Sequence, residues 1–461
     1  MRLGKQQQRC RQCLRRLAGA ALVLYLSAGA PTASAQTAAG SPHWVGTWAT
    51  VPVARCPGHA AGQLPQDQGR RCDQGSTDRT GQGQTPPPPA QAPLPVLNNQ
   101  TLRQIVRVSV GGDRVRVVLT NAYGTAPVVV GAAQVALRAK DRAILPQSAR
   151  ALTFSGRNTT TIAPGAVVFS DAVNLTIPAL ADLAIDLYLP ENTAATPTPV
   201  TVHAGTGGLQ TNYVSETGNH VGAASLPTKE TTLAWHFLMR VEVTAADQVG
   251  AIVTLGDSIT DGSQSSPDTN NRWPDHLARR LAKQNLGMAV LNAGFSGNRV
   301  LSDSSAVSAL VRFDRDVLAQ TGVTHVIVLE GINDIGMARA NPSPSAADII
   351  AGHKQLIMRA RAQGLKIYGA TLTPFEGANY FTKEGEAKRQ AVNEWIRTSQ
   401  EYDGVIDFDA VVRDPGRPAK HLPQYDPGDH LHATDAGYEA MANAINLDWF
   451  KAGQRGTPAT R

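Results

Sequence analysis

The chain has 461 residues, of which 42% are hydrophobic and 17% charged, so it is long enough for more than one domain. Its formal net charge is +6, but six of the 43 Lys and Arg residues, and none of the acids, fall in the first 35 residues. The remainder holds 37 basic against 37 acidic residues. This balance excludes an electrostatic argument for nucleic-acid binding.

Residues 1–35 have the pattern of a secretory signal peptide. A basic start precedes the apolar run LAGAALVLYLSAGA and the small-residue site ASA, which ends at Ala35. The run is too short to span a bilayer. We therefore expect a secreted or periplasmic mature protein without a transmembrane segment. The pair Arg15-Arg16 leaves a twin-arginine export route open.

Removal of this segment leaves two cysteines, Cys56 and Cys72. In an oxidising compartment we expect them to form a disulfide, which would stabilise the fold by about 3 kcal/mol in the chain-entropy model; a reactive thiol is the alternative. A Pro/Gln/Gly-rich stretch at about 57–95 cannot bury enough apolar surface to order itself, so it predicts a surface loop pinned by the disulfide.

Residues 36–247 carry short alternating segments separated by Gly, Pro, Asn and Asp, which predicts an antiparallel β-sandwich or jelly roll. Within them, TLRQIVRVSV-GGD-RVRVVLTNAYG predicts a hairpin around the Gly-Gly-Asp turn. Residues 248–452 alternate apolar strand-like runs with amphipathic stretches, giving five βα units and a parallel sheet covered on both faces. Residues 453–461 are a tail.

Polar residues follow the predicted strands of the second region. Ser258 comes after GAIVTLG, two glycines (Gly294 and Gly297) come at the end of AVLNAG and just beyond it, and Asn333 comes after THVIVLEG. Asp429 and His432 lie beyond the last strand. Ligand sites in parallel sheets lie at the carboxyl ends of the strands. Together these residues supply a nucleophile, hydrogen-bond donors, a base and an acid, which is the set that acyl transfer requires.

The blocks GDSITDG, NAGFSGN, GIND and DHLH resemble, in order, those of the SGNH hydrolases, the GDSL-type esterases and lipases. The resemblance implies a flavodoxin-like α/β/α domain with Ser258 as nucleophile, His432 as base and Asp429 as its partner. It implies an oxyanion hole of Ser258 N–H, Gly297 N–H and the Asn333 side chain. Gly294 is the rival to Gly297, but the spacing from Asn292 matches Gly297 in the family. No cofactor and no metal are implied.

The resemblance also implies a secreted two-domain form, because WVGTWAT and the segment from Leu102 are similar to the β-sandwich of some relatives. The expected reaction is hydrolysis of carboxylic esters through an acyl-enzyme on Ser258. Short acyl chains are the expected substrates by family analogy, with O-acetylated polysaccharide first. A lipase or arylesterase acting on small molecules or polyesters, and an acyltransferase with the same residues, stay open, as does the oligomeric state.

Three other interpretations compete with this one. His430 and His432 alternate on an extended segment and would suit a metal pair, but no further ligand cluster completes it. The β domain would be a carbohydrate-binding module if aromatic residues are exposed on it; Trp44, Trp48, Tyr123 and Tyr213 are the candidates. Trp273 would line the substrate pocket in a third interpretation. We favour the alternative that Trp273 packs on the sheet at the start of a helix, with Pro274 in the first turn of that helix.

Overall fold

The computed structural model describes residues 43–57, 93–196, 198–204, 208–337 and 343–451. The predicted signal peptide at 1–35, Cys72, most of the loop at 57–95 and the tail at 453–461 lie outside the described residues. Cys56 is described and buried. The disulfide and the signal peptide therefore stay predictions.

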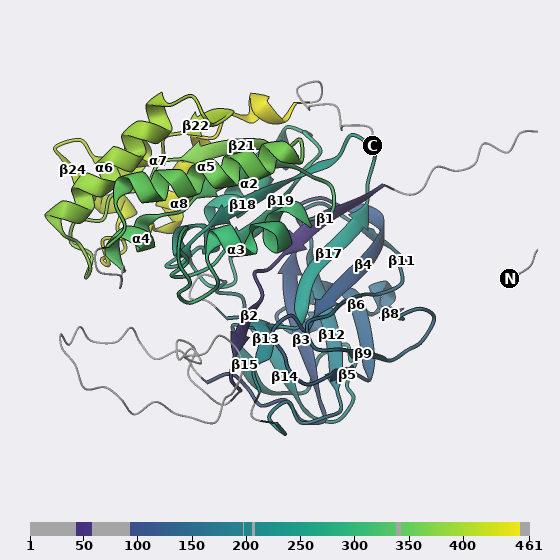
Figure 1. The fold of residues 1–461 in the computed structure, drawn as a ribbon. Helices are drawn as coiled ribbons and strands as arrows, with labels where there is room; N and C mark the ends of the chain where they lie inside the picture. The colour runs from purple at the N-terminus through teal and green to yellow at the C-terminus, as the bar shows by residue number, and fades with distance from the viewer. Residues whose placement is uncertain (1–42, 58–92, 197, 205–207, 338–342, 452–461) are drawn as a thin grey trace, which may run out of the picture. The chain divides into compact units, whose positions relative to one another are not determined.

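Residues 43–247, called the β region below, form antiparallel sheets, as predicted (Figure 1). One sheet has the order β1-β17-β4-β10 with β11 beside β4, and a larger one has the order β15-β14-β3-β12-β6-β7 with β8 beside β6. Two small sheets, β16-β13-β2 and β5-β9, complete the region. Its strands are β1 (Trp44–Ala49), β2 (Val53–Arg55), β3 (Gln100–Arg107), β4 (Gly112–Thr120), β5 (Val128–Val130), β6 (Ala132–Lys140), β7 (Ala143–Ile144), β8 (Arg150–Leu152), β9 (Thr160–Ile162), β10 (Val167–Phe169), β11 (Val173–Ile177), β12 (Asp182–Leu189), β13 (Val200–His203), β14 (Asn212–Thr217), β15 (Thr228–Thr232), β16 (Trp235–His236) and β17 (Leu238–Thr244).

The predicted hairpin across the Gly-Gly-Asp turn is wrong. Both strands exist as β3 and β4, but they lie in different sheets: β3 pairs with β12 and β14, and β4 pairs with β17, β10 and β11. Between them, Val108 N–H donates to Ala181 O and Ser109 N–H to Thr47 O, so the chain crosses from one sheet to the other. Gly111 allows this crossing, because a Cβ there would lie 2.1 Å from Ile177 O.

The region from residue 248 contains the predicted parallel sheet, with strand order β19-β18-β20-β21-β22. This is a doubly wound order with its switch point at β18. The strands are β18 (Gly250–Gly256), β19 (Met288–Gly294), β20 (Val323–Leu329), β21 (Lys366–Ala370) and β22 (Gly404–Ile406). All seven residues of β18 are buried, which explains why the sequence there is apolar except for Thr254.

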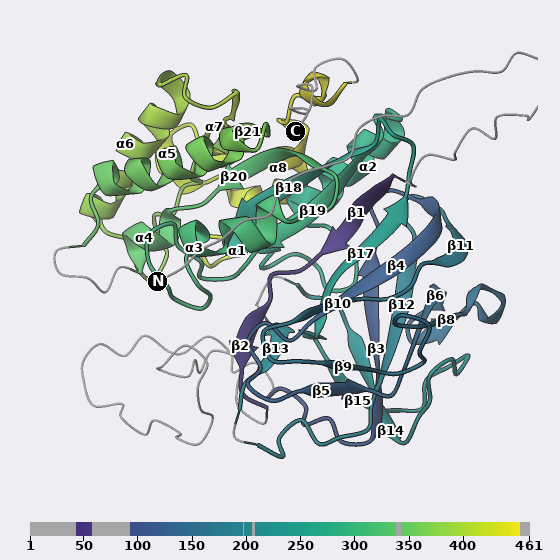
Figure 2. The same cartoon turned by 45° about the vertical axis from the view of Figure 1, so that its right-hand side comes forward.

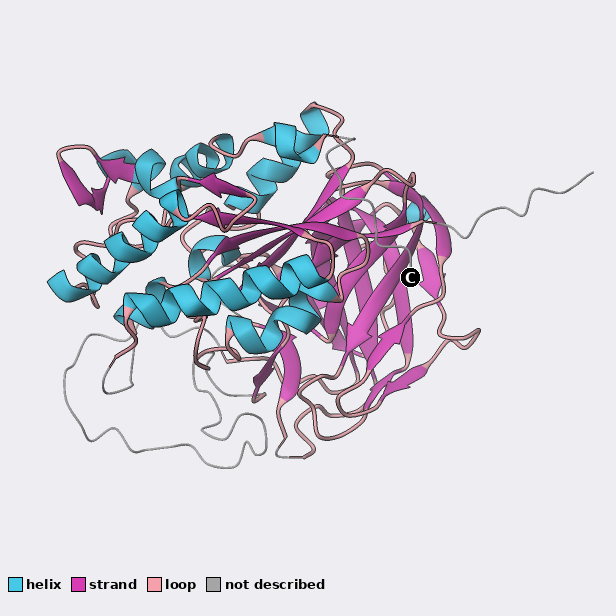
Figure 3. Ribbon diagram, turned by 45° about the horizontal axis from the view of Figure 1, so that its top comes forward, coloured by secondary structure: helices cyan, strands magenta, loops and turns pink. Residues whose placement is uncertain are grey.

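Helices of the second region form two groups. Helices α2 and α8 contact each other, and α3, α5 and α6 form a second set in contact (Figure 2). Figure 3 shows the helices in cyan and the strands in magenta. The helices are α1 (Ser258–Asp261), α2 (Trp273–Lys283), α3 (Ala309–Phe313), continued by a π-helix (Asp314–Leu318), α4 (Ile332–Gly336), α5 (Ala346–Ala362), α6 (Lys383–Thr398), α7 (Phe408–Val412) and α8 (Asp435–Asn443). A small hairpin of β23 (Arg413–Asp414) and β24 (Arg417–His421) follows α7.

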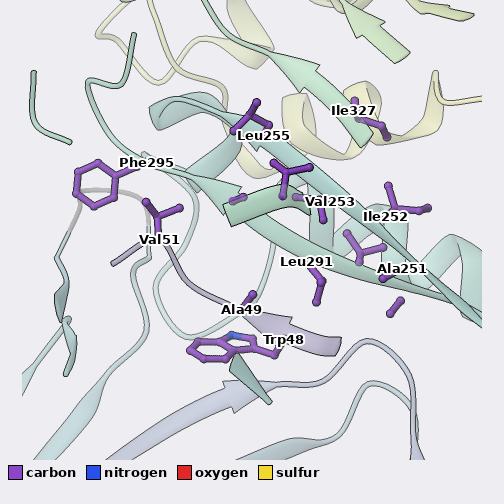
Figure 4. Close-up of a cluster of buried hydrophobic side chains, with 14 of the residues drawn as sticks. Trp48, Ala49, Val51, Ala251, Ile252, Val253, Leu255, Leu291, Phe295 and Ile327 are labelled. Atoms are coloured by element: carbon purple, nitrogen blue, oxygen red, sulfur yellow. The ribbon is translucent and has the colours of Figure 1, made fainter. Parts of the chain in front are cut away.

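The two regions share one hydrophobic core. Figure 4 shows Trp48, Ala49 and Val51 of the β region beside the β18 side chains and Phe295. Polar contacts also cross the junction: Val290 N–H donates to Ser109 Oγ at 2.9 Å, and His43 Nε2 lies 2.8 Å from Val249 O. Residues before and after the predicted boundary at 247/248 belong to one compact unit, and the domain limits themselves stay a prediction.

Candidate active site

The turn after β18 presents Ser258. Asp257 accepts Ile259 N–H at 2.9 Å and so caps the short helix α1, which begins at Ser258. The N–H of Ser258 lies in the first turn, where helix geometry offers no intrahelical acceptor, and it makes no hydrogen bond to the described part of the chain. Ser258 is only 6% exposed. Little of its surface therefore meets solvent.

His432 and Asp429 lie against this serine. Ser258 Oγ is 2.8 Å from His432 Nε2, and His432 Nδ1 is 2.6 Å from Asp429 Oδ2. A carboxylate only accepts, so Nδ1 carries the proton and Nε2 accepts from the serine hydroxyl. Burial alone would raise the pKa of Asp429, but the hydrogen bond and charge of His432, with the N–H groups of His432 and Leu431, hold this pKa below its ordinary value. Asp429 is thus ionised at neutral pH.

The neighbouring histidine has a different partner. His430 Nδ1 lies 2.5 Å from Asp426 Oδ2, while Asp426 Oδ1 accepts the N–H groups of Gly428 and His430. His430 has a φ of +59°, a left-handed conformation that a bulky residue rarely adopts. Asp426 therefore fixes the bend that carries Asp429 and His432 toward the serine.

Of the two candidate glycines, only Gly297 keeps its N–H available. Gly294 N–H donates to Asn292 Oδ1 at 2.8 Å, and a Cβ on Gly294 would lie 2.2 Å from Asp261 N. Gly294 is therefore needed for the close approach of β19 to α1. Gly297 has a φ of +74°, and its N–H has no acceptor among the residues that the structure describes.

Asn333 is tied to the same turn. Its Nδ2 donates to Asn298 O at 2.9 Å, and an amide nitrogen has a second hydrogen to offer. Tyr380 lies 3.4 Å from Asn333 Oδ1 through its hydroxyl, which orients the amide. The next residue, Asp334, accepts the N–H groups of Val300 and Leu301. The structure thus brings Gly297 and Asn333 together through residues 298–301.

A buried arginine joins the strand ends beneath the site. Arg312 is 1% exposed and donates to Gly256 O at 2.9 Å, to Ala293 O at 2.8 Å and to Asn298 Oδ1 at 2.8 Å. It also lies 3.7 Å from Glu330 Oε2. One side chain therefore connects the ends of β18, β19 and β20.

Three buried carboxyl groups, those of Glu330, Asp257 and Asp334, have raised pKa values. Burial raises the pKa of Glu330 well above its ordinary value and also raises the pKa of Asp257. Burial raises the pKa of Asp334 to about 6, although the N–H groups of Val300 and Leu301 oppose this shift. Of these acids and Asp429, only Asp429 has a pKa below its ordinary value.

Several residues at the site were not predicted. Asp261 and Ser296 lie inside the motif blocks, so the blocks are the signal that could have found them. His203 and Arg312 carry no such signal. Gln264 Nε2 donates to Asp429 Oδ2 at 3.1 Å. Trp273 is fully buried against Phe408, as favoured.

The described residues give little support to the metal-pair and carbohydrate-binding interpretations. Within the described residues no three His, Cys, Asp or Glu side chains cluster as metal ligands would, and no helix there has the length and apolar character of a membrane span. Of the candidate sugar-binding aromatics, Trp48 and Tyr213 are buried. The Trp44 ring is covered by Arg116, whose Cζ lies 4.3 Å from its centroid, and the Tyr123 ring lies beside Arg315.

Residues 254–440 match the model of the GDSL-like Lipase/Acylhydrolase family. These residues are a GDSL-like lipase/acylhydrolase domain. The chain therefore contains the domain of a GDSL-family carboxylic ester hydrolase, and an antiparallel β region precedes this domain. Ser258, Gly297, Asn333, Asp429 and His432 all lie inside the GDSL-like domain, whereas His203 lies outside it.

Solved structures that are similar to part of this chain come from several bacteria. A lipolytic protein of the G-D-S-L family from Desulfitobacterium hafniense has 22% identity and a TM-score of 0.33, covering 42% of this chain and 96% of that one. A carbohydrate acetylesterase from Sinorhizobium meliloti has 15% identity and a TM-score of 0.34, covering 42% and 96%. An acetyl-xylooligosaccharide esterase from Geobacillus has 21% identity and a TM-score of 0.34, covering 46% and 99%. No curated protein matches the chain.

Proposed function

We propose that this chain is an exported serine esterase that hydrolyses short-chain acyl esters through an acyl-enzyme on Ser258. One observation carries the proposal: the unbroken hydrogen-bond path from Ser258 Oγ to His432 at 2.8 Å and from His432 to Asp429 at 2.6 Å. A serine hydroxyl is a weak nucleophile until a base removes its proton, and this path supplies the base and the group that orients it.

The reaction follows from these contacts. His432 Nε2 takes the hydroxyl proton as Ser258 Oγ attacks the ester carbonyl, and the ionised Asp429 stabilises the resulting imidazolium. The N–H groups of Ser258 and Gly297 and the amide of Asn333 face the developing oxyanion, each lowering the barrier by about 3 kcal/mol. The protonated histidine then gives its proton to the departing alcohol. Water, activated by the same histidine, releases the acid.

The acyl group that we propose is small. Ser258 is 6% exposed and Asn333 is 2% exposed, so little of either residue is accessible to a bulky group. An acetyl group fits this restriction better than a long chain does. O-acetylated polysaccharide is therefore our first candidate, because only the small acetyl group of such a polymer has to reach Ser258.

A panel of esters tests the proposal. Wild type and Ser258→Ala would be assayed on p-nitrophenyl acetate, butyrate and octanoate and on acetylated xylan. We expect kcat/KM to fall as the acyl chain lengthens, and Ser258→Ala to lose about 10⁴-fold or more in kcat. Full activity in the alanine variant would refute the mechanism. Product analysis with an added sugar acceptor distinguishes hydrolysis from acyl transfer, since transfer would acylate the sugar.

Export and the disulfide are parts of the same proposal. The basic, apolar and small-residue order of residues 1–35 supports cleavage after Ala35, and the oxidising compartment favours pairing of Cys56 with Cys72. Intact mass of the exported protein tests both points. We expect a chain that begins at Gln36 and gains two hydrogens on reduction. A cytoplasmic chain that keeps residues 1–35 would contradict export.

A further inference from the structure

We infer that the β region positions the oxyanion turn, residues 295–298, through the side chains of His203 and Asp261. This inference rests on the proposed function, because it assigns Gly297 N–H to the oxyanion. His203 and Asp261 act here as positioning residues that do not touch the substrate.

Asp261 links the two regions because its two carboxylate oxygens contact different partners. It lies three residues after Ser258 on α1 and is 2% exposed. Ser296 Oγ donates to Asp261 Oδ2 at 3.0 Å, and His203 Nε2 lies 3.2 Å from Asp261 Oδ1. The side chains of the histidine and the aspartate are 5% and 3% exposed, so little water screens their contact. Each carboxylate oxygen therefore has its own donor.

His203 is fixed by the β region. It ends β13, and its Nδ1 lies 3.3 Å from Val51 N and 3.2 Å from Val51 O. Its ring packs edge-on against Trp235 at 5.5 Å and against Phe295 at 5.2 Å. Because a carboxylate only accepts, Nε2 must carry the proton that faces Asp261 in either protonation state. The ring thus delivers a donor to Asp261 from a rigid place.

The hydrogen bond between Ser296 and Asp261 fixes the position of Gly297. Ser296 directly precedes Gly297, so the peptide between them carries the Gly297 N–H. The Ser296 side chain is held by Asp261, and Ser304 Oγ donates to Gly297 O. Phe295, which begins the oxyanion turn, contacts the His203 ring and is fully buried. The direction of the Gly297 N–H is therefore set from both sides of the peptide.

Loss of His203 would leave Asp261 with an unpaired buried oxygen. Such a group is costly, because a buried acceptor without a partner loses its hydration and gains nothing in return. The carboxylate would turn or draw in water, and its hold on Ser296 would weaken. The expected consequence is a misplaced oxyanion donor, which affects the transition state more than the bound substrate.

Kinetics of four variants test the inference. The changes are His203→Ala, His203→Gln, Ser296→Ala and the double variant His203→Ala/Ser296→Ala, assayed on p-nitrophenyl acetate. We expect each alanine variant to lower kcat about tenfold with KM changed less than about twofold, because an interaction made only in the transition state is weakened. His203→Gln should restore most of kcat, since its amide N–H reaches toward Asp261. The double variant should lose no more than either single variant.

His43→Ala is the matched control. This histidine also belongs to the β region and also contacts the second region, with Nε2 at 2.8 Å from Val249 O before the start of β18. We expect its kcat to stay at the wild-type value. Equal losses of kcat in His43→Ala and His203→Ala would show that any weakened contact between the two regions lowers activity. That result would overturn the inference.

Two further outcomes also overturn it: a wild-type kcat in Ser296→Ala, which removes only a hydroxyl, or strictly additive losses in the double variant. Ser258→Ala, run in the same series, separates this inference from the proposed function. An active Ser258→Ala enzyme refutes the proposed function, whereas an inactive one with an unaffected His203→Ala refutes only the inference.

Discussion

At the residue scale, the segment Asp429-His430-Leu431-His432 assigns each histidine to a different acid. His432 bonds Asp429 and reaches Ser258, whereas His430 bonds Asp426 and is bent into a left-handed conformation. His432 follows its acid, Asp429, by three residues. His430 follows its acid, Asp426, by four residues. The two histidines of this loop therefore have different partners, and only His432 contacts Ser258.

The pair gives a direct comparison of variants. His432→Ala removes the proposed base, and we expect kcat to fall by about 10⁴-fold or more. His430→Ala removes a half-exposed ring whose partner, Asp426, still bonds two backbone N–H groups, and we expect kcat to change less than about tenfold. Steady-state kinetics on p-nitrophenyl acetate measures both. A larger loss in His430→Ala would show that the base is assigned to the wrong histidine.

The sequence predicts the residues that carry motif signals and misses those that do not. Ser258, His432 and Asp429 were named from their blocks, and the structure places them within hydrogen-bonding distance. The choice between Gly294 and Gly297 needed the structure, because only the fold shows that Asn292 engages the Gly294 N–H. His203 stands in an ordinary strand pattern 55 residues before Ser258, so nothing in the sequence connects it with Asp261.

At the element scale, the end of α3 determines how the strand ends meet. Among the described residues, Arg312 is the side chain through which this helix bonds the carbonyl groups of Gly256 and Ala293. We expect Arg312→Ala to lower the free energy of unfolding by about 3–5 kcal/mol, because the buried acceptors Gly256 O, Ala293 O and Asn298 Oδ1 then lose their donor. Urea denaturation measures the change.

Arg359→Ala is the matched control for this prediction. It pairs with Asp314, whose side chain is 72% exposed, and surface pairs contribute less than about 1 kcal/mol. A loss in Arg359→Ala as large as in Arg312→Ala would contradict the role assigned to the buried arginine.

Elements were predicted best where burial has one simple pattern. The five parallel strands are mostly apolar, so each is predicted from its apolar run, and α2, α5 and α6 are predicted from their amphipathic spacing. The error at β3 and β4 arose because a Gly-Gly-Asp turn between alternating strands also fits a chain that crosses between sheets. Strand partners depend on contacts far along the chain, which a local pattern does not contain.

At the scale of the whole molecule, buried histidines link stability to pH. Burial lowers the pKa of His353 to about 4, although its hydrogen bond to Glu330 O opposes this shift. The unfolded chain, with an ordinary histidine pKa of 6.5, then binds more protons than the folded chain between pH 6.5 and 4. The stability from neutral His353 is therefore fully present above pH 6.5 and is lost as the pH falls toward 4.

We expect this histidine to make the wild type about 2 kcal/mol less stable at pH 5 than at pH 7. His353→Gln keeps an N–H for Glu330 O but does not titrate, so the difference between pH 7 and pH 5 should shrink by about that amount. Urea denaturation of both proteins at the two pH values measures it. An unchanged pH difference in the variant would contradict a neutral buried His353.

The most direct test of the central claim is covalent labelling of the nucleophile. A fluorophosphonate reacts with an activated serine, and peptide mass spectrometry then locates the adduct. We predict one adduct, on Ser258, in wild type and in His430→Ala, and none in Ser258→Ala or His432→Ala. A label on Ser263 or Ser296, or a label that persists after Ser258→Ala, would contradict the account.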